Sequence, residues 1–130
     1  MTIQESNKLI AEFMGWTEES PYSDVPDAAK RWFCPYEFPH YKKAMTTNGL
    51  EFHNSWDWLM PVIEKIERSY LCEQEYANQV VILLNTCSIE PSNYANPIGQ
   101  KMIESFGETK LEATYKAVVE FIQWYNEKKS

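Results

Sequence analysis

Hydrophobic residues at helical spacing predict a first helix close to the N-terminus. Residues 2–5 (TIQE) have the form of a capping box, and apolar residues follow at helical intervals over 9–14. Gly15 stands where a left-handed residue commonly ends a helix, and Trp16 is then the hydrophobic residue that folds back beyond the cap.

A second helix is predicted from Asn54 or Ser55 to about residue 70. On a helical wheel its apolar face collects Trp56, Leu59, Met60, Ile63, Ile66 and Tyr70. This phase places Trp56 in the core. It leaves Trp58 on a flank of the helix, where a ligand or a partner would account for it.

A third helix is predicted from Thr109 to about Asn126, after a second capping box at 109–112. One apolar stripe, assigned to the sheet, consists of Leu111, Tyr115, Val118, Ile122 and Tyr125. A second stripe consists of Ala113, Ala117, Phe121 and Trp124. Two interpretations of the second stripe stay open: the first helix or the aromatic segment 17–40 covers it within the chain, or it is the interface of a homodimer.

The Asn-Gly pair at 48–49 predicts a two-residue hairpin turn, because both residue types tolerate positive φ. The flanking strands are expected near 41–47 and 50–53. In this register Met45 lies opposite Phe52 on one face of the hairpin.

Further strands are predicted in the second half of the chain. Residues 80–84 (VVILL) are apolar at both parities, which predicts a strand covered on both faces. Residues 87–89 continue an extended segment after a turn, 91–99 (PSNYANPIG) form a loop, and 100–106 form a last strand.

Residues 17–40 are rich in proline and aromatic residues, so an ordered loop packed on the domain is expected, with a short helix near 24–32. Taken together, the elements predict an α+β fold. Residues 1–130 form a single layered domain, in which a small, mainly antiparallel sheet packs with about three helices.

Charge and composition limit the partners. The chain has 19 acidic and 12 basic residues, for a net charge of −7, which does not suit binding along an extended nucleic acid. Aromatic residues make up 15% of the chain, and a stacking platform for a small nucleotide is one use for them. The candidate ligand-binding or partner-binding residues are Trp58, Trp32, Tyr36, Tyr41 and Lys42.

The cysteines indicate a compartment. Cys34, Cys72 and Cys87 are an odd number without CxxC spacing, and no secretory leader pattern accompanies them, so reduced thiols in a cytoplasm are expected. The longest apolar run, at 80–84, has five residues and is too short to cross a membrane.

Catalytic motifs are absent from the sequence. The glycines are too far apart for a GxGxxG, P-loop or GxSxG motif. His53 and Asp57 are four residues apart, but His53 precedes the predicted cap, which favours a structural role for it. Cys34 with His40 lacks the further ligands that zinc needs. We therefore assign no catalytic residue, no metal ligand and no cofactor.

Three segments resemble known sequences: IAEFMGW at 10–16, FHNSWDWLMPVIEKIE at 52–67 and ESFGETKLEATYKAVVEFIQWYN at 104–126. They resemble a group of small uncharacterised proteins of gut bacteria and their phages, which are similar to the phage α-β-α sandwich domain family. The resemblance implies a helix–sheet–helix layering. It implies no activity and no binding residues.

These observations lead to a hypothesis of function. The protein is expected to be a small, non-enzymatic accessory protein of phage or mobile-element type in a bacterial cytoplasm. It would act by binding, either sequestering a nucleotide signal or blocking a host protein. The alternatives are a hydrolase that gathers His53, Asp57 and a glutamate around a metal, and a structural assembly subunit.

Overall fold

The computed structural model describes residues 1–19, 30–35, 44–68, 78–91 and 102–129. The helices in these residues are α1 (Ile3–Phe13), α2 (Trp56–Arg68) and α3 (Lys110–Lys129). One antiparallel sheet contains β1 (Thr17–Glu19), β2 (Arg31–Phe33) and β3 (Ala44–Thr46), in that order. The other contains β4 (Asn78–Leu83), β5 (Thr86–Pro91) and β6 (Ile103–Phe106).

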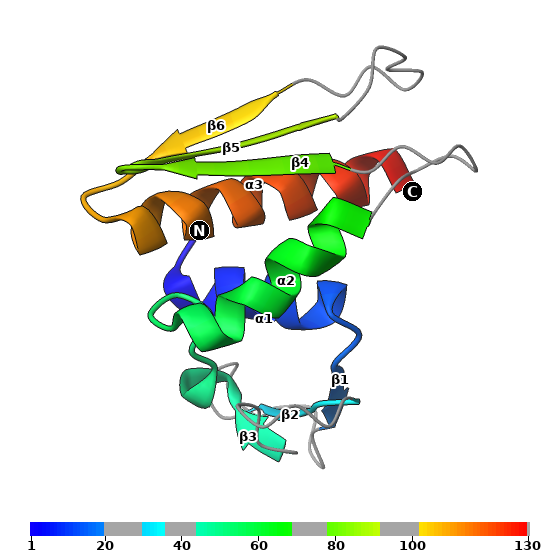
Figure 1. Ribbon diagram of the computed structural model, residues 1–130. Coiled ribbons are helices and arrows are strands. Elements are labelled where there is room, and N and C mark those ends of the chain that lie inside the picture. The colour runs from blue at the N-terminus through cyan, green and yellow to red at the C-terminus, as the bar shows by residue number, and fades with distance from the viewer. Residues whose placement is uncertain (20–29, 36–43, 69–77, 92–101, 130) are drawn as a thin grey trace.

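The described elements stack in four layers (Figure 1). The β4–β5–β6 sheet lies on α3, α3 lies on α1 and α2, and the small β1–β2–β3 sheet lies beyond them. One hydrophobic cluster runs through these layers, from Trp32 in β2 to Ile103 in β6. The predicted α+β class is confirmed, with two sheets in place of one. The order of layers differs from the helix–sheet–helix arrangement that the resemblance implies.

Helix α1 begins and ends as predicted. The backbone N–H of Glu5 donates to Thr2 Oγ1 at 3.1 Å, which caps the first turn. Gly15 has a φ of 83°, and the N–H of Trp16 donates to the carbonyl of Ala11 at 2.9 Å. This geometry is a Schellman cap, and it turns the Trp16 side chain into the core.

The predicted phase of α2 is wrong on one flank of the helix. Its buried residues are Trp58, Leu59, Val62, Ile63 and Ile66. Trp58 is only 5% exposed, while Trp56 is half-buried and Met60 is largely exposed. Leu59, Ile63 and Ile66 mark the centre of the buried face, and apolar residues lie on both sides of it. The helical wheel alone therefore does not show which side is buried.

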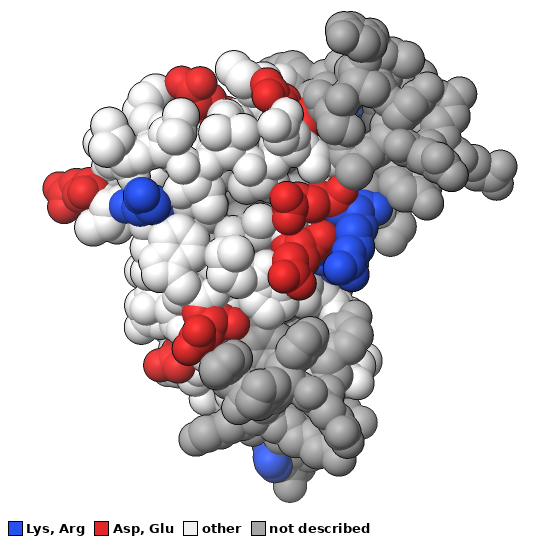
Figure 2. Space-filling model, in the orientation of Figure 1, with Lys and Arg blue, Asp and Glu red and all other residues white. Residues whose placement is uncertain are grey.

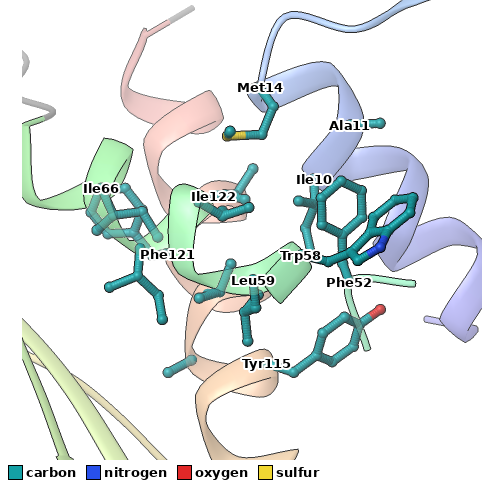
Figure 3. Close-up of a cluster of buried hydrophobic side chains, with 14 of the residues drawn as sticks. Ile10, Ala11, Met14, Phe52, Trp58, Leu59, Ile66, Tyr115, Phe121 and Ile122 are labelled. Atoms are coloured by element: carbon teal, nitrogen blue, oxygen red, sulfur yellow. The ribbon is translucent and has the colours of Figure 1, made fainter. Parts of the chain in front are cut away.

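An aromatic cluster buries Trp58 instead of Trp56. The ring centroid of Trp58 lies 5.1 Å from that of Phe52 (Figure 3). It lies 6.0 Å from the ring centroid of Trp16. Phe52 precedes the helix and Trp16 follows α1, so the contact joins three separate segments. Burial of Trp58 is therefore a tertiary effect.

The predicted hairpin turn at 48–49 is wrong. Strand β3 pairs upstream with β2, and Thr47–Gly49 forms a 3₁₀ turn in which no residue has positive φ. Thr47 holds this arrangement: its N–H donates to the Lys30 carbonyl at 3.0 Å, and its hydroxyl accepts from Trp32 Nε1 at 2.9 Å. Residues 50–53 are not a strand, although Leu50 and Phe52 are fully buried.

The segment 17–40 is not only a loop, because β1 and β2 lie in it. Arg31 and Trp32, expected at the end of a short helix, are extended and belong to β2, the middle strand of its sheet. Proline and aromatic content predicted order here, but not strand pairing. The rest of the expected helix near 24–32 lies outside the described residues.

In the second sheet, β4, β5 and β6 overlap the predicted strands, but their ends differ. Strand β4 ends at Leu83, so Leu84 lies in the turn, β5 extends to Pro91, and β6 begins at Ile103. The rest of the expected 91–99 loop lies outside the described residues. Cys87, Ile89 and Ile103 point toward α3 and are buried. The opposite face holds Leu83, which is 63% exposed, and Phe106, which is 59% exposed. No described helix or strand covers this face, so the predicted cover on both faces of 80–84 is wrong there.

Most residues of both apolar stripes of α3 are buried inside the chain, and Leu111, Trp124 and Tyr125 are half-buried. Tyr115 and Tyr125, assigned to the sheet, instead contact α1: the Tyr115 hydroxyl donates to Asn7, and the Tyr125 ring lies 5.7 Å from that of Phe13. The sheet lies along the other side, where Thr114 is hydrogen-bonded to Cys87. The stripe proposed as a dimer interface is internal: Ala113, Ala117 and Phe121 are 0% exposed, and Trp124 is half-buried.

This burial favours the interpretation in which the same chain covers the second stripe. Helix α1 provides part of this cover, as that interpretation expected, because the Phe13 ring lies 6.4 Å from the Phe121 ring. The β4–β5–β6 sheet packs on the same helix. The stripe is therefore not a surface on which a second copy can dock. Among the described helices, none is both long enough and apolar enough to span a membrane.

The two tryptophans of α2 predict different costs of truncation. Trp58→Ala removes a buried ring and should lower the free energy of unfolding by about 3–5 kcal/mol. Trp56→Ala removes a half-buried ring and should cost only about 1 kcal/mol. Urea unfolding followed by circular dichroism measures both, and equal losses would contradict this packing.

Two glycines provide a second stability test. A Cβ at Gly107 would lie 2.6 Å from the backbone nitrogen of Ala113, so Gly107→Ala should cost about 1–3 kcal/mol. A Cβ at Gly49 would meet no atom closer than 3.6 Å, and its φ is not positive. Gly49→Ala should therefore change the stability by less than about 1 kcal/mol. A large loss from Gly49→Ala would mean that the hairpin turn does form.

Candidate functional site

The aromatic residues predicted to bind a ligand do not form an exposed platform. Trp58 is in the core, and Trp32 is 1% exposed with its indole N–H donated to Thr47. Tyr36, Tyr41 and Lys42 lie outside the described residues. The high aromatic content suggested a binding role for these two tryptophans, but both are packed in the core.

All three helices begin at the same end of the molecule (Figure 1). A cleft of about 540 Å³ lies at this end. We call it the His53 cleft. Its lining comes from the start of α1, the turn before α2 and the first two turns of α3, and consists of Met1, Ile3, His53, Asn54, Thr109, Leu111, Glu112, Tyr115 and Lys116. The walls are mainly apolar, and a few polar groups converge on them.

A buried polar network forms the back of the cleft. Asn7, on the inner face of α1, is 2% exposed. Its amide Nδ2 donates to the Leu50 carbonyl at 3.1 Å and lies 2.9 Å from His53 Nδ1. Its Oδ1 accepts from the Tyr115 hydroxyl at 2.9 Å. One amide therefore connects α1, the turn before α2, and α3.

This network sets the hydrogen-bonding direction of His53. Because Asn7 Nδ2 is a donor, His53 Nδ1 must act as the acceptor, and the neutral imidazole then carries its proton on Nε2. The ring is also held against Tyr115 in an edge contact, with centroids 6.2 Å apart. His53 is thus a fixed, half-buried donor at the wall of the cleft.

Tyr115 is held in its protonated form. Burial raises the pKa of its hydroxyl to about 12, and a hydrogen bond with Ser6 lowers the pKa by a smaller amount. The hydroxyl also lies 3.4 Å from the Ile3 carbonyl. Tyr115 therefore presents its ring to the cleft and donates its proton inward, which does not suit a catalytic base.

The rim of the cleft carries an ion pair. Lys116 Nζ lies 2.9 Å from Glu112 Oε1, one turn apart on α3, and the hydrogen bond from Lys116 lowers the pKa of the Glu112 carboxyl. Lys116 also donates to the Phe106 carbonyl at 3.3 Å. Both side chains are about half exposed, so the pair adds little stability, and the rim has almost no net charge.

The arrangement required for a metal-dependent hydrolase is missing from the described part of the chain. Within it, no group of three or more His, Cys, Asp or Glu side chains is placed to hold a metal ion. Asp57 is exposed on the first turn of α2, and His53 Nδ1 is engaged with Asn7. Cys34 and Cys87 are buried, and burial raises the pKa of the Cys87 thiol.

The sequence pattern pointed to His53 but missed Asn7 and Tyr115. Asn7 and Ser6 lie on the buried face of α1, beside Ile10 and Ala11. Adjacent polar residues on an otherwise apolar helix face are the signal that was available, because buried polar groups need partners. The identity of those partners depends on how the helices pack.

Comparisons with known proteins add no family. No protein-family model, curated protein or solved structure matches this chain. The resemblance to phage-type proteins therefore remains a hypothesis, and the site is interpreted from its geometry.

The buried hydroxyl of Tyr115 predicts a pH-dependent effect of Tyr115→Phe. At pH 8 the variant should be less stable by about 1–3 kcal/mol, because Asn7 Oδ1 loses its donor. In the wild type the raised pKa stabilises the fold fully below about pH 10, and this contribution, on the order of 2–3 kcal/mol, is lost as the pH rises toward 12.

Tyr115→Phe has no hydroxyl, so it lacks the stability that the raised pKa of Tyr115 gives the wild type. The difference in stability between the two proteins should therefore shrink between pH 10 and pH 12. Urea unfolding of both proteins at several alkaline pH values measures it. A difference that stays constant over this range would show that the hydroxyl is not buried.

Proposed function

We propose that the protein acts by binding, and that the His53 cleft holds a small ligand. The observation that carries this proposal is a mainly apolar cleft of about 540 Å³ whose donor, His53, is oriented from behind by a buried amide. Small-molecule sites commonly have this size and this mixture of apolar wall and few polar groups. A donor that is already oriented loses little freedom on binding.

The cleft favours a ligand with an apolar ring and a hydrogen-bond acceptor. Leu111, Ile3 and the Tyr115 ring offer apolar contact, and His53 Nε2–H offers a donor. Lys116 is already paired with Glu112, so little positive charge is available for a polyphosphate. A nucleoside, or a nucleotide bound mainly through its base, fits these conditions.

This proposal includes a biological role. A phage-type accessory protein in a bacterial cytoplasm that sequesters a nucleotide signal would need such a cleft and no catalytic group. The resemblance of three sequence segments to phage-associated proteins motivates the role, and the buried free thiol of Cys87 suits a reducing compartment. The hydrolase alternative has no comparable support in the described residues.

Thermal-shift measurements test the ligand proposal. A panel of adenosine, cyclic dinucleotides, ADP-ribose derivatives and linear dinucleotides is added at millimolar concentration. A ligand at ten times its Kd stabilises the fold by about 1.4 kcal/mol, which should raise Tm by roughly 3–6 °C. No shift with any member of the panel would contradict a nucleotide-type ligand.

A blocked cleft provides the matched control. Ile3→Trp should fill the cleft and abolish the shift without lowering Tm, because Ile3 is 56% exposed at its wall. Met60→Trp places the same ring on α2, where Met60 is 43% exposed outside the cleft, and should leave the shift intact. Equal shifts in the two variants would place the ligand elsewhere.

A further inference from the structure

The face of the β4–β5–β6 sheet that points away from α3 is a second, separate surface. We call it the outer sheet face. By strand alternation and register, its described residues are Gln79, Val81, Leu83, Thr86, Ser88, Glu90, Glu104 and Phe106. In register, Leu83, Thr86 and Phe106 form one row across the sheet, and Val81, Ser88 and Glu104 form the next.

The first of these rows ends in two exposed apolar residues, with Thr86 between them. Leu83 is 63% exposed and Phe106 is 59% exposed. Met102, which is 52% exposed, precedes β6 at the other end of the sheet. Isolated exposed apolar residues are ordinary on protein surfaces. Several large ones gathered at one end of a sheet face are typical of an interaction surface.

The β4–β5 turn adds a strained residue to this surface. Leu84 has a φ of 51°, the left-handed region in which glycine or asparagine is favoured, and its side chain is 82% exposed. A bulky apolar residue at this position costs stability twice, by backbone strain and by exposure. Such strain is often found where the residue has a function outside the fold.

The charge of the outer sheet face favours a partner with basic side chains over a second copy of this chain. Glu90 and Glu104 lie on it, and none of its described residues is Lys or Arg. Separate acidic side chains are visible among uncharged residues at the upper edge of the molecule, where this sheet lies (Figure 2). A second copy would bring carboxylates close to carboxylates, whereas a surface with basic side chains complements them.

We propose that the outer sheet face, with the Leu83–Leu84 tip, docks on a partner protein that presents apolar side chains flanked by lysine or arginine. Two strands of six residues and one of four make a face that is at most roughly 20 Å long and about 10–15 Å wide. The area of this face is smaller than the area that each partner buries in a standard interface, which is about 800 Å². The complex is therefore a transient one, and it is independent of the His53 cleft.

Site-specific photo-crosslinking in the native host cell tests the proposal. Benzoylphenylalanine replaces Ser88, at the centre of the outer sheet face, and the same group at the exposed Glu64 of α2 is the control position. The expected result is a covalent adduct with a different protein from position 88 and not from position 64. Peptide mapping of the adduct should find lysine or arginine beside apolar residues.

Two variants connect the adduct to the proposed chemistry. The yield from position 88 should fall about tenfold in Leu83→Ser with Phe106→Thr, and again in Glu90→Lys with Glu104→Lys. The matched change Met60→Ser with Glu64→Lys, on exposed α2 positions, should leave the yield unchanged. Both outer-face variants should keep the wild-type Tm, because their side chains point away from the core.

Leu84→Gly separates strain from binding. It should raise Tm, because glycine accepts a φ of 51°, and lower the adduct yield, because the apolar tip is lost. An adduct of twice the chain mass, an adduct only with lipid, or no adduct would overturn the proposal. A yield indifferent to Glu90 and Glu104, a large fall in Tm of the outer-face variants, or a lower Tm for Leu84→Gly would overturn it as well.

Discussion

Helix α3 is covered on two sides, and this constraint places the other layers. The sheet β4–β5–β6 packs along one side, where Ala113 and Ala117 are small enough for close approach, and α1 packs along the other through Tyr115 and Phe13. A helix buried this way needs apolar residues around more than half of its circumference. The same requirement explains why its second stripe resembled an interface when only the sequence was considered.

The buried amide of Asn7 is a consequence of this packing. Where α1 crosses the start of α3, a polar side chain lies inside the core, and it is tolerated because its donors and its acceptor are matched by Leu50, His53 and Tyr115. The cost of losing any partner keeps the groups aligned. The buried Asn7 amide thus fixes the orientation of His53 at the wall of the cleft.

The two proposed surfaces differ in how the fold produces them. The His53 cleft forms where three helix starts converge, so its shape depends on all three. The outer sheet face is exposed because the described helices lie on one side of the sheet only. Burial of its exposed apolar residues against a partner would be favoured by the hydrophobic effect. The exposed and strained Leu84 is the local sign of that availability.

The sequence by itself determined the elements governed by local physics. The caps at Thr2 and Thr109 and the left-handed Gly15 depend on neighbouring backbone groups, so they were predictable together with the α+β class. Tertiary structure decided the rest. Whether Trp56 or Trp58 is buried, and whether β3 pairs upstream or across an Asn-Gly turn, depends on which distant segment provides the contact. Local periodicity does not contain that information, because two arrangements bury similar apolar area and only long-range packing separates them.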